Sequence, residues 1–172
     1  LKIGPFNNLD SIKVLVINNC GSLDSIYGFP KVKHLETLII EDCTELEKIN
    51  AFSNINSLNS LSLISLPEIE SPAFINRIDS FNHKLELSNL SFTNLNLFSH
   101  LRKVSILRLT QLNNVEKIKF PNLQSAESIF IENNSNLTSI DSFLILKKTG
   151  DLFVSSNPLL ENISYFPSFT ST

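Results

Sequence analysis

The chain has 172 residues, of which 42% are hydrophobic and 18% charged, and its formal net charge is −3. This length fits a single domain with a core of its own, and the slightly acidic balance excludes the basic surface of a nucleic-acid-binding protein. No apolar run approaches the roughly 18 residues of a transmembrane helix. The chain opens LKIGPF without Met, so we interpret residues 1–172 as one domain excised from a longer protein or repeat array.

A repeat of about 23 residues runs along the chain and sets the expected elements. Each copy opens with an aromatic residue, at Phe6, Phe29, Phe52, Phe98, Phe120, Phe143 and Phe166, with Ile75 in the one vacancy. Nine residues later, or ten in the fourth copy, an apolar-x-apolar pair follows. In chain order the pairs are Leu15/Ile17, Leu38/Ile40, Leu61/Leu63, Leu85/Leu87, Leu107/Leu109, Ile129/Ile131 and Leu152/Val154. This period of two predicts seven short strands, each with two side chains inward and one outward.

A single copy is too small to bury a core, so neighbouring copies must cover one another's apolar faces. Stacked strands then share backbone hydrogen bonds at a spacing of about 4.8 Å and form a parallel sheet along one side. The aromatic column becomes an internal spine on the far side. We therefore predict a mainly β, helix-poor parallel β-solenoid of about seven turns, each of about 22–24 residues, with a Phe spine.

The residues that follow each strand give a second repeating signal. Five positions after the first member of each pair lie Cys20, Cys43, Leu66, Leu90, Leu112, Asn134 and Asn157. The pattern L-x-L-x2-N/C-x2-L-x2-I resembles the leucine-rich repeat over essentially the whole chain. ENNSNLTSID and SSNPLLENIS are most similar to the receptor L-domain group of growth-factor receptors and lipid-anchored fungal cell-wall proteins. The resemblance implies a right-handed, short-turned solenoid, although Leu occupies three of these positions and the receptors' cysteine-rich modules are missing.

The fourth copy, SPAFINRIDSFNHKLELSNLSFTNLNLF, departs most from the pattern. It has one extra residue before its strand and places Thr93 where Leu is expected. We expect a drifted turn that bulges on the convex side of the solenoid. A functional insertion or a bend is the alternative.

Cys20 and Cys43 occupy equivalent positions in adjacent turns. Neighbours in register lie about 4.8 Å apart, within the range that a disulfide tolerates. In this repeat class, however, the position points into the turn, where a thiol serves as a small buried hydrophobe. Free thiols are the favoured interpretation, and a disulfide is the alternative.

Four sequons occur, at Asn89, Asn133, Asn136 and Asn162, and they permit N-glycosylation. With 21 Asn and 32 Ser plus Thr, about four such matches arise by chance. We expect Asn136 and Asn162, on turns that leave the sheet, to be better acceptors than Asn133 and Asn89, which end strands.

The outward residue at the centre of each strand belongs to one column, which is the predicted binding face. Its members are Val16, Ile39, Ser62, Glu86, Arg108, Phe130 and Phe153. Phe130 and Phe153 should form an exposed aromatic pair, which is typical of binding patches but also stabilises neighbouring strands. Glu86 beside Arg108 predicts a surface ion pair worth under about 1 kcal/mol.

Signals for catalysis are weak. The three histidines (His34, His83 and His100) lie at unrelated phases of the repeat, and only four glycines are present. No HExxH, GxSxG or Cys-x-x-Cys motif occurs. We therefore expect a non-enzymatic protein without cofactor or metal.

Two main functions remain open. The first is an extracellular or cell-surface recognition or adhesion module that binds protein or glycan through the strand face. The second is a structural subunit that associates end to end in a wall element or fibre. HLETLIIEDCTELEKI also resembles the irregular repeats of intracellular plant immune receptors, which is the weakest of the three alternatives.

Overall fold

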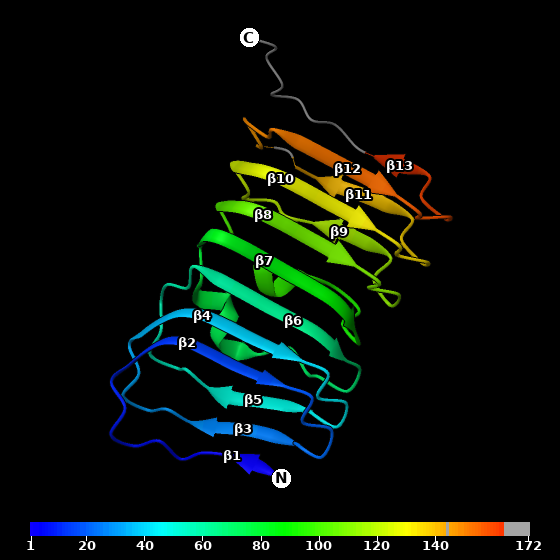
Figure 1. The fold of residues 1–172 in the computed structure, drawn as a ribbon. Coiled ribbons are helices and arrows are strands. Elements are labelled where there is room, and N and C mark those ends of the chain that lie inside the picture. Colours follow the sequence, from blue (N-terminus) through cyan, green and yellow to red (C-terminus); the bar gives the residue numbers. More distant parts are fainter. Residues whose placement is uncertain (144, 164–172) are drawn as a thin grey trace.

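The computed structural model describes residues 1–143 and 145–163, and these form a mainly β solenoid of about seven turns (Figure 1). One side is a seven-stranded parallel sheet, here called the front sheet, with the order β12-β10-β8-β7-β6-β4-β2. Its strands are β2 (Ser11–Asn18), β4 (His34–Glu41), β6 (Ser60–Leu66), β7 (Ser80–Leu90), β8 (Lys103–Thr110), β10 (Ser125–Glu132) and β12 (Asp151–Ser155). Each strand contains one predicted apolar pair, so the predicted solenoid is confirmed.

The opposite side carries a second layer that the repeat pattern did not reveal. Two parallel sheets form it, β1-β3-β5 and β9-β11-β13. The first has β1 (Lys2–Ile3), β3 (Ser25–Gly28) and β5 (Lys48–Ala51), and the second has β9 (Lys117–Lys119), β11 (Ser139–Ser142) and β13 (Asn162–Ile163). Between them, the 3₁₀ helices η1 (Ala73–Arg77) and η2 (Asn96–Phe98) take the place of strands. We call this broken layer the back layer.

Every front strand ends in the same backbone conformation. One residue per turn has a φ of 51–57°: Asn19, Asp42, Ser65, Asn89, Gln111, Asn133 and Ser156. Asn and Asp tolerate this left-handed region best among residues with side chains. A β-turn follows directly, as in the Leu23 N–H bond to the Cys20 carbonyl at 2.9 Å. These seven bends send the chain from the front sheet toward the back layer.

Asparagine side chains complete this turn near the C-terminal end. The Leu112 N–H donates to Asn134 Oδ1 at 2.9 Å, and Asn134 Nδ2 donates to the Leu109 carbonyl at 3.2 Å. The Asn134 N–H donates in turn to Asn157 Oδ1 at 3.0 Å. Asn134 is buried, so its amide satisfies backbone groups that water cannot reach.

The Phe spine is present, but in two runs. Ring centroids are 4.7 Å apart for Phe6–Phe29 and 4.9 Å for Phe29–Phe52, and 6.2 Å apart for both Phe98–Phe120 and Phe120–Phe143. Between the runs, Phe74 packs edge-on against Phe52 at 5.7 Å. Ile75, in the predicted vacancy, is fully buried beside it. Phe166 lies outside the described residues.

The extra residue of the fourth copy lies in the front sheet, so the expected bulge on the convex side is wrong for this residue. Pairing between β7 and β8 shifts between Phe81 and Lys84, where two residues of β7 face the single residue Ser105. Ser105 Oγ donates to the Asn82 carbonyl at 2.9 Å, which anchors the bulged strand. The same copy also contains both 3₁₀ segments of the back layer.

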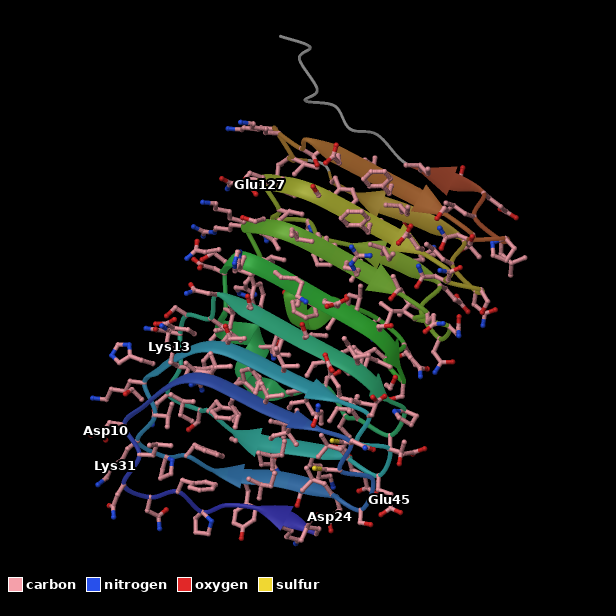
Figure 2. All side chains as sticks on the ribbon, in the orientation of Figure 1. Asp10, Lys13, Asp24, Lys31, Glu45 and Glu127 are labelled. Carbon is pink, nitrogen blue, oxygen red and sulfur yellow. The ribbon has the colours of Figure 1, made fainter. Side chains whose placement is uncertain are left out.

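Charged side chains lie along both edges of the coil. Figure 2 shows Asp10, Lys13 and Lys31 along one edge of the coil, and Asp24 and Glu45 along the other. The Ser25 hydroxyl donates to Asp24 at 2.7 Å and holds the pKa of this carboxyl below its usual value.

In the described part of the chain, no helix is long and apolar enough to cross a membrane.

Candidate functional site

The predicted column of outward residues is a continuous row across the front sheet. Strand register pairs Val16 with Ile39, Ile39 with Ser62, Ser62 with Glu86, Glu86 with Arg108, Arg108 with Phe130, and Phe130 with Phe153. The row changes character along its length, because it is apolar at the N-terminal end, charged in the middle and aromatic at the C-terminal end. We call it the front row.

Phe130 and Phe153 form the aromatic end of the front row. Their ring centroids are 4.8 Å apart and their planes differ by 5°. The spacing equals the distance between neighbouring strands, so the parallel backbone itself stacks the rings. Phe130 is half-buried and Phe153 is 48% exposed. The pair therefore offers apolar surface that is already fixed in one arrangement.

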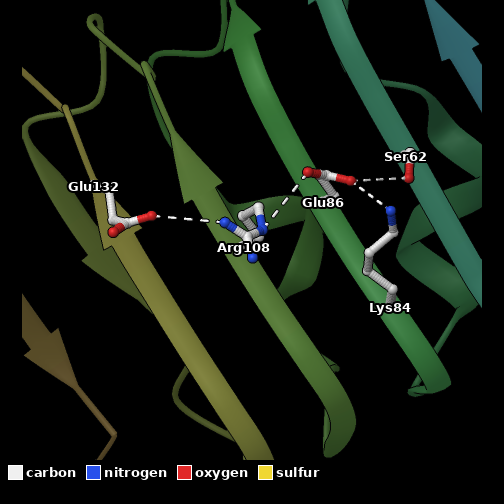
Figure 3. A network of polar contacts seen from close by, with 5 residues as sticks. All are labelled: Ser62, Lys84, Glu86, Arg108 and Glu132. Atoms are coloured by element: carbon white, nitrogen blue, oxygen red, sulfur yellow. Dashed lines mark hydrogen bonds and ion pairs between the residues drawn. The ribbon is translucent and has the colours of Figure 1, made fainter. Parts of the chain in front are cut away.

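Arg108 extends this stack on the other side. Its guanidinium carbon lies 4.2 Å from the Phe130 ring centroid, which is a cation–π contact. The guanidinium also pairs with two carboxylates, Glu86 through Nε at 3.7 Å and Glu132 through Nη1 at 3.6 Å (Figure 3). Arg108, Phe130 and Phe153 thus form one stack of planar groups, and the two carboxylates hold the guanidinium in it.

Glu86 joins the stack to the strands on the N-terminal side. Lys84 Nζ lies 2.6 Å from Glu86 Oε2, and the Ser62 hydroxyl donates to the same oxygen at 3.4 Å (Figure 3). The Glu86 side chain is only 17% exposed. The predicted pair of Glu86 and Arg108 is therefore present, but within a five-residue network.

The N-terminal end of the front row is apolar. Val16 is 51% exposed and Ile39 is half-buried, and Val14, two residues before Val16 on the same face, is 53% exposed. Sequence reasoning followed only the centre of each strand and therefore missed Val14, Lys84 and Glu132. Each of them lies two residues from a front-row residue, so period two applied along the whole strand would have found them.

Both cysteines are free thiols in the structure. Cys20 Sγ contacts the Asn18 carbonyl and Cys43 Sγ the Glu41 carbonyl, each at 3.3 Å. No disulfide joins Cys20 to Cys43. Burial raises the pKa of the Cys43 thiol, whose side chain is fully enclosed.

All four sequon asparagines are exposed. Asn136 lies in a turn as expected, where its Nδ2 donates to the Asn113 carbonyl at 2.8 Å. Asn162 instead begins strand β13, so its expected place on a turn is wrong. Asn89 lies inside β7 and Asn133 directly follows β10.

The structure offers no metal centre in residues 1–143 and 145–163, because no three His, Cys, Asp or Glu side chains gather there in a suitable cluster. Comparisons with known proteins do not add a relative. No protein-family model, no curated protein and no solved structure matches the chain.

Proposed function

We propose that this chain is a non-enzymatic recognition module, outside the cell or at its surface, that binds a protein or glycan through the front sheet. The observation that carries the proposal is the exposed stack of Arg108, Phe130 and Phe153 on a rigid sheet. The sequence resemblance to leucine-rich repeats of the receptor L-domain group supports the same proposal. Four exposed sequon asparagines fit an extracellular location.

The physical advantage of the stack is preorganisation. Aromatic and arginine side chains dominate the binding energy of many interfaces, and ordering a free side chain costs about 0.5–1.5 kcal/mol. Here each ring is held by a neighbouring strand, and Arg108 is held by Glu86 and Glu132. A partner would meet these groups without that cost.

A double substitution, Phe130→Ser with Phe153→Ser, tests the proposal. Wild-type chain is screened on a glycan array and on an array of extracellular proteins, and the strongest ligand is then titrated against the variant. We expect binding to fall at least tenfold, while circular dichroism and thermal unfolding remain cooperative. Tyr27→Ser, which removes an exposed aromatic ring from the back layer, is the matched control and should bind like wild type. Unchanged binding by the double variant contradicts this site.

End-to-end association is the second candidate function. Large apolar side chains are exposed on the first and last described turns: Phe6 (45%), Leu9 (37%), Leu152 (37%), Leu159 (52%) and Ile163 (48%). Within the described residues, the front sheet also ends in strands β2 and β12, each with one open edge. Light scattering over a wide concentration range tests this candidate, and a constant monomer mass at high concentration contradicts it.

A further inference from the structure

The break in the back layer creates a polar hollow. Neighbouring turns carry β3, β5, β9 and β11, but two turns in the middle carry η1 and η2, the coiled segments within the green part of Figure 1. A hollow of about 400 Å³ lies between the chain around η2 and strand β9. This volume falls in the range of about 300–1,000 Å³ that is usual for ligand sites.

The backbone–backbone hydrogen bonds that tie adjacent turns together are interrupted at this hollow. At the entry to the back layer, Glu70 N–H donates to the Glu47 carbonyl at 2.8 Å and Thr138 N–H donates to the Glu116 carbonyl at 2.9 Å. Asn94 occupies the same phase of the repeat, because the fourth copy carries one extra residue before its strand. Among the described residues, no backbone hydrogen bond joins Asn94 to Glu70 or to Glu116. The chain separates here, and the departure seen in the sequence of the fourth copy coincides with an opening in the surface.

Strand β9 presents an open edge to this hollow. Its only strand partner in the described chain is β11. The Glu116 carbonyl accepts from Thr138 and therefore faces β11. Because the backbone groups of successive residues in a strand point to opposite sides, the N–H and C=O of Lys117 and Lys119 face the hollow. Both side chains are exposed, and only Ile118 between them is buried.

The opposite wall consists of amide and hydroxyl groups held in place by local hydrogen bonds. Asn94 Oδ1 accepts from the Asn96 N–H at 3.0 Å, and Asn94 Nδ2 approaches Thr93 Oγ1 at 3.5 Å. On the β9 side, Asn114 Nδ2 donates to the Ser91 carbonyl of the preceding turn at 3.4 Å, which leaves its Oδ1 free to accept. Leu95, the one apolar residue of the lining, is only 2% exposed. The hollow therefore offers hydrogen-bond partners to a ligand rich in hydroxyl groups.

The charges of the lining favour an acidic ligand. Lys117 and Lys119 contribute two ammonium groups, and Glu116 contributes one carboxylate. Lys119 has a weak ion pair with Asp141 at 3.9 Å, whereas the Lys117 side chain has no ion-pair partner in the described chain. The repeat-equivalent residues Glu47 and Glu70 are acidic, whereas Asn94 at this phase is neutral, so the fourth copy lacks the carboxylate that would oppose an anion at this place.

We propose that this hollow binds an anionic saccharide, whose carboxylate or sulfate pairs with Lys117 and Lys119 while its hydroxyl groups bond the amides of Asn94, Asn96 and Asn114. The site lies on the back layer and does not depend on the front row. A saccharide fits better than a simple anion, because the amide wall supplies both donors and acceptors along the hollow. Charge-assisted hydrogen bonds to the two lysines supply the selectivity for acid groups.

The test is an NMR titration of ¹⁵N-labelled chain with four probes: trigalacturonate, a heparin tetrasaccharide, neutral cellotriose and sodium sulfate. We expect at least one acidic saccharide to shift the amide signals of Asn96, Lys117 and Lys119 in a saturable way. Which of the two does so distinguishes a carboxylate from a sulfate ligand. Equal binding of cellotriose or of sulfate alone overturns the assignment, as does the absence of saturable shifts with both acidic saccharides.

Variants locate the site. Lys117→Gln with Lys119→Gln should weaken the acidic saccharide by about tenfold or more, the loss expected for charge-assisted bonds. Lys48→Gln, at the phase of Lys117 but on β5, should leave its affinity unchanged. Equal losses in both variants overturn the proposal, because binding would then follow net charge alone.

A second pair of variants adds a carboxylate without removing a lysine. Thr93→Glu places a carboxylate in the lining of the hollow and should also weaken the acidic saccharide by about tenfold. Thr138→Glu, which adds a carboxylate to the turn that carries β11 and lies outside the lining of the hollow, is the control and should bind as wild type. Undiminished binding by Thr93→Glu overturns the placement of the ligand.

Discussion

The turns that follow the front strands are stabilised by different side chains at the two ends of the solenoid. Near the C-terminal end, Asn157 Nδ2 donates to the Ile131 carbonyl, 26 residues earlier, at 2.9 Å. Near the N-terminal end, Cys43 Sγ lies 4.0 Å from the Ile17 carbonyl, also 26 residues earlier. The backbone is alike in both places, since Asp42 and Ser156 both have a φ above 50°. The bend is therefore a property of the repeat. The side chain in the turn determines how strongly the turn is bonded to the preceding one.

The largest effect in this comparison is expected at Asn134. Asn134→Leu leaves the buried Leu112 N–H and the Leu109 carbonyl without their side-chain partner. We expect the free energy of unfolding to fall by about 2–4 kcal/mol, because each unsatisfied buried group costs about 1–3 kcal/mol. Urea denaturation measures the loss. Asn136→Ala removes one exposed hydrogen bond and serves as the control, with a loss under about 0.5 kcal/mol. Equal losses would show that the buried ladder has no special role.

A smaller effect is expected at the cysteine turns. Cys43→Ala removes a fully buried thiol that makes only weak contacts, so we expect a loss of about 1–2 kcal/mol. Cys20→Ala removes a half-buried thiol on the first turn and should cost less. A loss for Cys43→Ala as large as that for Asn134→Leu contradicts the difference between the two ends.

The smallest effect concerns reactivity and leaves stability unchanged. Burial raises the pKa of the Cys43 thiol, so less of it is thiolate at a given pH, and the thiolate is the reactive form. We expect iodoacetamide to label Cys20 before Cys43 in the folded chain, and the rate at Cys43 to rise only at higher pH. Peptide mass spectrometry after timed labelling measures both rates. Equal rates in the folded state, with equal rates in urea as the reference, contradict the buried environment of Cys43.

The front sheet was predictable because its strands are long enough to show period two. Leu38 and Ile40 point inward with Ile39 between them, and the same apolar-x-apolar sequence recurs in every turn. The short back strands were not predictable in this way. Strand β9 has three residues and a single buried side chain, Ile118, so it offers no alternation to detect. The apolar residues at this phase were recognised as periodic, but not as strands.

The candidate site was predictable from the sequence only in part. Strand register alone brings Phe130 beside Phe153, so the aromatic pair followed from the repeat. The position of the Arg108 guanidinium did not, because it contacts a ring and a carboxylate on β10 and a second carboxylate on β7. When a long side chain has several possible partners, small energy differences determine which of them it contacts. The hollow beside Thr93 also depends on how a departing chain packs, which a repeat pattern does not encode.

Cysteine cross-linking tests most directly whether the front sheet presents Phe130 and Phe153 side by side. In a background with both native cysteines replaced by Ala, Phe130→Cys is combined with Phe153→Cys, and separately with Ser155→Cys, one outward position farther along β12. Mild oxidation followed by intact-mass measurement should show a monomer lighter by two hydrogens for the first pair and little change for the second. Equal cross-linking of both pairs, or none in the first, would contradict the stacked front row and the recognition surface built on it.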